Sequence, residues 1–274
     1  MFPYQTFVDM EKSRVTSPID LHVENVLRRG YTVLENLISP EECEDYCQRL
    51  DVLWDRQVAE FGDERLRQLK DHGIVRCPLS QDRKFTELVM HPRVLEVLDR
   101  VLGSTAILHL QNGIVVHPTT VHQQSLFHRD FAKSFISNHP LSINVLWAMR
   151  PFTKETGATW VVPGTHNTQL VPSDEYTEAN AVQLEASPGS AVLFDSMLWH
   201  GGGQNKTDRR RHAVNHQYTK PFIKQQIDLP VLLAGMYDPE TPLGQKLGFW
   251  AIPPKSIAEF RADPDKRTYR PGQG

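Results

Sequence analysis

Cysteine is scarce in this chain of 274 residues, which contains only Cys43, Cys47 and Cys77. The odd count, with two cysteines four residues apart on an expected helix, argues against a disulfide framework and against a zinc site. Long apolar runs are also missing, since no stretch approaches the roughly 18 residues that a membrane-spanning helix needs. The first residues lack the basic and apolar parts of a secretion signal. We therefore expect a cytoplasmic protein that does not enter a membrane.

An excess of charge of either sign is missing as well. The chain has 30 Lys and Arg residues against 33 Asp and Glu residues, which gives a formal net charge of −3. This balance offers no electrostatic reason to bind nucleic acid or an anionic membrane surface. Apolar residues make up 39% of the chain, which is ordinary for a folded domain. We expect a small molecule as the partner, and a monomer or a homodimer as the assembly.

Two amphipathic helices are indicated before residue 105. Ser39 suits the N-cap of a helix whose first residue is Pro40, and Glu42 is placed for the reciprocal capping contact. A second helix is expected from Pro92 to about residue 102, with Gly103 ending it. A short strand is expected before the first of these helices, over residues 31–34.

The local composition of the sequence changes from Ala106 onward. Short segments rich in Val, Ile, Leu and Phe are separated by Pro, Gly, Asn and Thr, which predicts a β-rich core. Alternating apolar residues favour strands over 143–149, 182–186, 190–194 and 211–220. The expected organisation is one domain over residues 1–274, with a helical part over about 1–105, a β core over about 106–224 and a Pro-rich extension over 225–274.

His128 and Asp130 form the first candidate chemical motif. They lie two residues apart, so on an extended chain both side chains project to the same side. Two histidines and one carboxylate on one face of an octahedron hold iron(II) in non-haem oxygenases. His200 is the best third ligand because it follows a predicted strand and precedes the glycine run 201–203, which lets backbone approach closely. Without further signals, a His-x-Asp pair is more often structural.

Arg211 is the second candidate group. It opens a predicted strand on which Ala213 and Asn215 share its face, and small Ala213 leaves space beside the guanidinium. A guanidinium pairs with a carboxylate through two parallel hydrogen bonds, which suits it to anchor the far end of a dicarboxylate. The alternative is that the arginines over 209–211 form a solvated loop, and this reading is expected to hold for Arg209 and Arg210.

The chain resembles the phytanoyl-CoA dioxygenase family of iron(II)/2-oxoglutarate oxygenases. The resemblance runs from about Arg29 to Lys224 and rests on motifs that arrive in the family's order. These are the segment 30–43, the His128-Arg129-Asp130 triplet, the segment 156–166 ending in Pro-Gly-Thr-His, and the stretch from Pro188-Gly189 through His200 to Thr207. His166 in this set is interpreted as structural.

The resemblance implies a mainly β fold with flanking helices, built on a double-stranded β-helix (jelly-roll, cupin-like) core. It implies iron(II), 2-oxoglutarate and dioxygen as cofactor and cosubstrates, and oxidation of a small-molecule C–H bond, with hydroxylation favoured and with conversion of 2-oxoglutarate to succinate and carbon dioxide. The residues carried over are His128, Asp130 and His200 as catalytic metal ligands and Arg211, Trp147, Gln111 and Asn112 as cosubstrate contacts.

The substrate is the least determined part of this expectation. Candidates for contact with it are the residues that flank the metal motif, namely Arg129, Phe131, Lys133 and Asn144. Because Asp130 is a carboxylate, whereas halide-transferring relatives have a small residue there, the resemblance disfavours halogenation. The alternative reading is a non-oxidative small-molecule-binding protein or an isomerase on the same fold.

Overall fold

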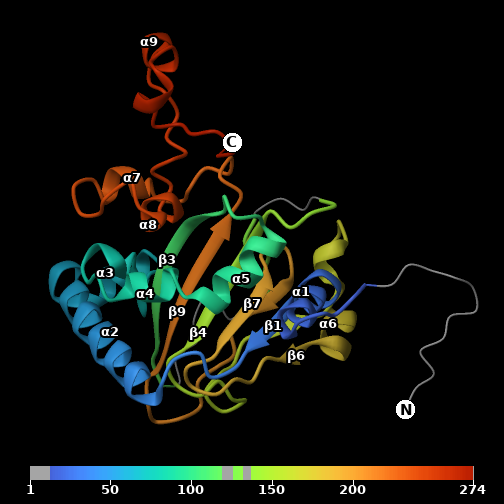
Figure 1. Cartoon of the computed structure of the whole chain (residues 1–274). Helices are drawn as coiled ribbons and strands as arrows, with labels where there is room; N and C mark the ends of the chain where they lie inside the picture. The colour runs from blue at the N-terminus through green and yellow to red at the C-terminus, as the bar shows by residue number, and fades with distance from the viewer. Residues whose placement is uncertain (1–12, 119–125, 132–136, 274) are drawn as a thin grey trace, which may run out of the picture.

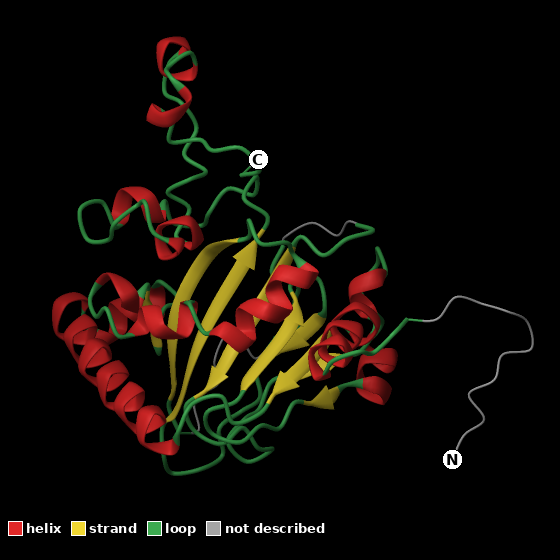
Figure 2. Cartoon of the chain, in the orientation of Figure 1, coloured by secondary structure: helices red, strands yellow, loops and turns green. Residues whose placement is uncertain are grey.

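The computed structural model describes residues 13–118, 126–131 and 137–273, and it consists of two antiparallel sheets with helices packed around them (Figures 1 and 2). The larger sheet contains β1 (Tyr31–Leu34), β2 (Ile74–Arg76), β3 (Ile107–Val116), β4 (Ser142–Ala148), β7 (Ala191–Asp195) and β9 (Arg211–Thr219). The smaller sheet contains β5 (Trp160–Val162), β6 (Val182–Gln183) and β8 (Trp199–Gly201).

Most helices lie outside the central strands. They are α1 (Pro18–Arg29), α2 (Pro40–Phe61), α3 (Asp63–Gln68), α4 (Phe85–Val89), α5 (Pro92–Val101), α6 (Asp174–Asn180), α7 (Leu229–Leu232), α8 (Pro242–Lys246) and α9 (Ile257–Phe260), with short 3-10 turns at Pro78–Ser80, Thr165–Asn167 and Pro264–Lys266. Figure 1 shows α2 to α5 along one side of the large sheet, and α9 standing away from the body at the end of the chain. Among the described residues, no helix is both long enough and apolar enough to cross a bilayer.

The strands of the large sheet follow the order β1-β7-β4-β9-β3-β2, and every neighbouring pair is antiparallel. In the small sheet the order is β6-β5-β8. The prediction of a β core with flanking helices is therefore confirmed. The helical part before residue 105 also supplies two strands of the large sheet, since β1 pairs with β7 and β2 pairs with β3.

The two faces of the large sheet contribute to different cores. On one face Val145 and Trp147 of β4 pack with Leu50 of α2 in the core that the helices share. On the other face Leu146 of β4 and Ala213 of β9 belong to a second core, which includes residues of the small sheet. Both faces of β4 are closed from water, because all seven of its residues are buried. The face of a side chain therefore decides whether it meets helices or the space between the sheets.

The predicted helix and strand positions agree closely with the structure, with one shortfall. Ser39 accepts a hydrogen bond from the Glu42 amide, and the Glu42 carboxylate accepts one from the Ser39 amide, which confirms the capping box. The strand expected over 182–186 is only β6, of two residues. Beyond it, Ala186 pairs with Phe152 through an isolated bridge. The alternation in that stretch thus reflects burial of side chains and not a continuous strand.

Candidate metal centre

His128 and His200 come from neighbouring pieces of backbone. The amide of His128 donates to the carbonyl of His200 at 2.7 Å, and the amide of His200 donates back at 3.1 Å, so the two residues form a single antiparallel bridge. Their ring centroids lie 4.3 Å apart. This bridge brings together two side chains that are 72 positions apart in the sequence, and it explains how a loop residue and the middle residue of β8 reach one site.

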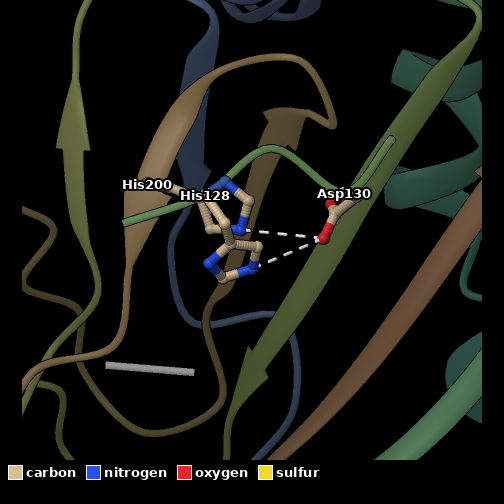
Figure 3. Close-up of side chains that lie close together, drawn as sticks. All are labelled: His128, Asp130 and His200. Atoms are coloured by element: carbon tan, nitrogen blue, oxygen red, sulfur yellow. Dashed lines mark ion pairs between the residues drawn. The ribbon is translucent and has the colours of Figure 1, made fainter. Parts of the chain in front are cut away.

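The Asp130 carboxylate faces both imidazole rings (Figure 3). Its Oδ1 atom lies 3.7 Å from Nε2 of His128 and 3.8 Å from Nε2 of His200. These separations are too long for hydrogen bonds, and the three ligand atoms lie within 4.8 Å of one another. The arrangement leaves a position between them that a cation can occupy while contacting all three. Among the described residues, this is the one group of three or more His, Cys, Asp or Glu side chains with such spacing.

The hydrogen bonds of both histidines suit metal binding. Nδ1 of His128 lies 2.8 Å from the carbonyl of Leu126, and Nδ1 of His200 lies 2.8 Å from the carbonyl of Leu198. A carbonyl can only accept, so each Nδ1 is the donor and each Nε2 is the ring atom left to face the metal position. Burial lowers the pKa of His200 below its ordinary value, which favours the neutral ring. Two neutral imidazoles and one carboxylate are the ligand set of non-haem iron(II) oxygenases.

Arg211 lies in the same pocket as these three side chains. The pocket is lined by Ile114, Val116, His128, Asp130, Asn144, Leu146, Thr159, Phe194, His200, Gly202, Gly203, Arg211 and Asn215. Arg211 is 6% exposed, and its guanidinium carbon lies 4.8 Å from the centre of the Phe152 ring. Its Nε atom is buried without a hydrogen-bond partner among the described residues. Burial lowers the pKa of Arg211 to about 10, so the charge persists at neutral pH and is suited to an incoming anion.

Two of the predicted cosubstrate contacts, Trp147 and Gln111, lie on the opposite face of the large sheet. Trp147 is fully buried on the helix-facing side of β4, with its ring 5.3 Å from that of His91. The Gln111 amide contacts Phe85 and His216 on the helix-facing side of β3. The structure therefore does not bring Trp147 or Gln111 to the pocket.

Asn112 has the pocket-facing orientation on β3, but its side-chain oxygen accepts from Arg76 at 3.4 Å. Asn112 is also absent from the residues that line the pocket. Trp147 and Gln111 could not be placed from the sequence, because strands with both faces buried give no signal for which face meets the site. Asn112 lies on the pocket-facing side but contacts Arg76 there.

The four residues predicted to contact the substrate also lie in different places. The Arg129 guanidinium donates to the backbone carbonyls of Thr165, Thr168 and Gln169, and so it supports a loop away from the pocket. Phe131 lines a different cavity of about 290 Å³, together with Ser142 and Asp195. Lys133 lies outside the described residues. Asn144 does line the pocket, where its amide donates to Asp130 at 2.5 Å.

Sequence reasoning missed several groups at the site. Thr159 and Asn215 line the pocket, and neither was singled out as a contact. For Asn215 a signal existed, since it shares the face of Arg211 on β9 by alternation. Arg210 lies in the loop before β9, where its partly exposed side chain donates to Asp51 of α2 at 2.8 Å. His166 was interpreted as structural, and its Nε2 atom lies 3.2 Å from the Leu27 carbonyl.

Comparison with known proteins gives matches along most of the chain. Residues 26–213 match the family model described as phytanoyl-CoA dioxygenase (PhyH). An uncharacterized protein of Mycobacterium tuberculosis is 38% identical over 252 residues, which cover 89% of this chain and 92% of that protein. Dioxygenase trt7 of Aspergillus terreus is 32% identical over 251 residues, covering 81% of this chain and 80% of that protein.

The fold has a counterpart among solved structures. The crystal structure of EctD from S. alaskensis with 2-oxoglutarate and 5-hydroxyectoine superposes with a TM-score of 0.61 and 21% identity, over 72% of this chain and 74% of that chain. At this identity the likeness concerns the fold. The sequence matches and the ligand set described above point independently to the same class of chemistry.

Proposed function

Because the chain belongs to the phytanoyl-CoA dioxygenase family, we propose that this iron(II)- and 2-oxoglutarate-dependent dioxygenase hydroxylates a C–H bond of a small-molecule metabolite. 2-Oxoglutarate is converted to succinate and carbon dioxide in the same turnover. The observation that carries the proposal is the combination, in one pocket, of a two-histidine, one-carboxylate set with a buried arginine that has no anionic partner in the described part of the chain.

His128, Asp130 and His200 are the proposed iron ligands. The two imidazoles present their Nε2 atoms to the metal position, and Asp130 supplies the carboxylate of the set. When bound, iron(II) and 2-oxoglutarate together supply the activation of dioxygen that oxidises a C–H bond. The chain's own part is to fix the three side chains that would hold the metal, on the wall of the pocket that also contains Arg211.

Arg211 is the proposed anchor of the distal carboxylate of 2-oxoglutarate. It stands at the start of β9, opposite Val116 of β3, and it has no anionic partner among the described residues. A carboxylate that pairs with it gains charge-assisted hydrogen bonds and also relieves a buried, uncompensated charge. Ile114, Leu146 and Phe194 give the pocket apolar walls, which exclude water from the methylene part of the cosubstrate.

The antiparallel sheets are further interpreted as a jelly-roll core within a single domain over residues 1–274. The large sheet and the small sheet share the apolar core that holds Ala213 and Val161, which supports one folding unit. The proposal keeps a small molecule as the substrate and predicts a cytoplasmic protein. It also predicts an oxygenated product and no halogenated one, because Asp130 retains the carboxylate.

The test is anaerobic loading of the purified protein with iron(II), followed by 2-oxoglutarate, dioxygen and a library of metabolites. Succinate is measured together with the mass of every metabolite. We expect succinate from the wild-type protein and one library member that gains a single oxygen atom, with neither result for His200→Ala. Absence of both metal binding and 2-oxoglutarate binding would contradict the proposal. A consumed metabolite without added oxygen would instead favour another oxidation or an isomerisation.

A further inference from the structure

We infer that Asn144 is a positioning residue for the metal centre, because its side-chain amide fixes which oxygen of Asp130 faces the two histidines. The inference rests on the proposed role of Asp130 as an iron ligand. It replaces the substrate contact that the sequence suggested for Asn144. Asn144 acts through Asp130 and is not itself a ligand.

The two oxygens of Asp130 have different partners. Oδ2 accepts a hydrogen bond from Nδ2 of Asn144 at 2.5 Å. Oδ1 is the atom that lies 3.7 and 3.8 Å from the Nε2 atoms of His128 and His200. The carboxylate is thus turned so that one oxygen is directed at the metal position and the other is held by the amide. Among the described residues, Asn144 is the one side chain that donates a hydrogen bond to this carboxylate.

The amide of Asn144 is itself held in a single orientation. Its Nδ2 atom also donates to the hydroxyl of Ser196 at 3.0 Å, so both amide hydrogens are used. Its Oδ1 atom accepts from Nδ2 of Asn215 at 3.3 Å. Rotating the amide by half a turn would place its oxygen against the Asp130 carboxylate and its hydrogens against an N–H donor. Asn144 is only 2% exposed, so water is not available to satisfy the rotated group.

A second layer of hydrogen bonds supports Ser196. Gln217 of β9 donates to Ser142 at 3.0 Å and to Ser196 at 3.1 Å, and the two serine hydroxyls lie 2.7 Å apart. The backbone of Asp130 joins the same group, since its amide donates to the carbonyl of Ser196 at 3.0 Å. Strands β4 and β9 and the turn after β7 therefore hold the Asp130 side chain and its backbone together.

This arrangement has a consequence for metal affinity. A metal-binding carboxylate whose second oxygen is hydrogen-bonded needs little reordering when the ion arrives, and removing such outer partners weakens metal binding by roughly 10- to 100-fold. Without the Asn144 amide, Oδ2 would lose its donor and the carboxylate could rotate about its terminal torsion. The loss is expected in metal affinity itself, before any turnover takes place.

The experiment compares Asn144→Ala with Gln111→Ala. Gln111 is a matched control because its amide is equally buried, on strand β3 of the same sheet, but contacts Phe85 and His216 on the helix-facing side. Dissociation constants for Co(II), used as a spectroscopic substitute for iron(II), are measured by absorption titration. We expect Asn144→Ala to bind Co(II) roughly 10- to 100-fold more weakly than wild type. Gln111→Ala should stay within about twofold, although its folded state is less stable.

A double-mutant cycle separates positioning from a general structural role. In an Asp130→Ala background, removing the Asn144 amide should change Co(II) affinity little, because the partner through which it acts is absent. Equal losses in both backgrounds would overturn the inference, as would an unchanged affinity in Asn144→Ala. Asn144→Ser serves the same comparison if the alanine variant does not fold. If wild-type protein binds no Co(II), the proposed metal centre fails, which is distinct from a cycle that shows no coupling.

Discussion

The buried guanidinium of Arg211 destabilises the cosubstrate-free protein. It is 6% exposed, its Nε atom has no partner among the described residues, and burial alone lowers its pKa. A buried charge without a counter-charge is unfavourable until an anion arrives. The pocket is thus arranged for a ligand at some expense of stability, as is common for binding sites.

Replacing Arg211 with alanine tests this balance. We expect 2-oxoglutarate affinity of the metal-loaded protein to fall roughly 10- to 100-fold for each charged hydrogen bond lost. The cosubstrate-free protein should keep its melting temperature or gain in it, because an unpaired charge is removed. Calorimetric titration and thermal unfolding measure the two effects. Arg210→Ala is the control, since Arg210 pairs with Asp51 outside the pocket and should leave 2-oxoglutarate affinity unchanged.

Among single residues, the sequence predicted the metal ligands better than the residues that hold them in position. The His-x-Asp spacing and the alternation on β9 place His128, Asp130 and Arg211 in one pocket, as expected. The contact of Asn144 with Asp130 could not be predicted, because it depends on how a loop residue meets a strand 14 positions later. The helix-facing position of Trp147 could not be predicted either, since all residues of β4 are buried and hydrophobicity does not distinguish its faces.

Among the elements, the connection after β8 is shaped by a close approach of two glycines. A Cβ atom on Gly203 would lie 2.6 Å from the Ala158 carbonyl oxygen and 2.8 Å from the Gly157 carbonyl carbon. A Cβ atom on Gly157 would meet the Gly203 carbonyl oxygen at 2.5 Å. These contacts are with backbone, which cannot move aside as a flexible side chain does. The glycine run after His200 therefore allows two loops to lie against each other beside the metal centre.

Gly203→Ala is expected to lower the free energy of unfolding by about 1–3 kcal/mol, the usual cost of forcing extra volume into a packed region. Because Gly203 lines the pocket three residues after a proposed ligand, metal affinity should fall as well. Urea unfolding and Co(II) titration measure the two quantities. Unchanged stability would mean that the two loops can separate without loss.

Helices and their ends were more predictable than strand pairings. The Ser39 capping box is local, because both of its hydrogen bonds join residues three apart, and the sequence therefore contains the whole motif. β2 was not predicted, since a three-residue strand carries no periodicity and is defined by its pairing with β3. The shortened β6 has the opposite origin, because Leu184 and Ala186 beyond its end are buried without continuing the ladder.

For the molecule as a whole, His216 links folding to pH. Its Nε2 atom lies 2.9 Å from Nε2 of Gln111, which can only donate, so the imidazole accepts and is neutral. Burial lowers the pKa of His216 to about 3. Below its ordinary value of 6.5 the unfolded chain binds a proton that the folded chain does not. The contribution of His216 to stability is therefore complete above that pH and is lost as the pH falls toward 3.

We expect His216 alone to lower the free energy of unfolding by about 1 kcal/mol for each unit by which the pH falls between 6.5 and about 3. His216→Leu should be less stable than wild type at about pH 8, because Gln111 loses its acceptor. Its stability should nevertheless fall less steeply between about pH 6 and pH 4.5. Denaturant titrations across that range measure both slopes. Parallel slopes would show that other groups dominate the acid response.

The order of the large sheet could not be obtained from the sequence. The neighbouring strands β1 and β7 pair Val33 with Val192, which lie 159 positions apart, and such long-range pairing leaves no local pattern. The fold class and the strand content could be predicted, because alternation and turn residues mark a strand whichever strand it pairs with. The family resemblance supplied the expected topology, and the antiparallel sheets of the structure are consistent with it.

The separation of the two faces of the large sheet has a practical consequence for engineering. Along β9, Arg211 and Asn215 line the pocket, while His212 and His216 contact groups on the helix side. Two mutational libraries can therefore be designed on the same strand. Odd-numbered positions of β9 would be varied to change which substrates the pocket binds. Even-numbered positions would be varied to raise the melting temperature. Few substitutions would affect both properties. An insertion of one residue in β9 would exchange the two sets and should inactivate the enzyme.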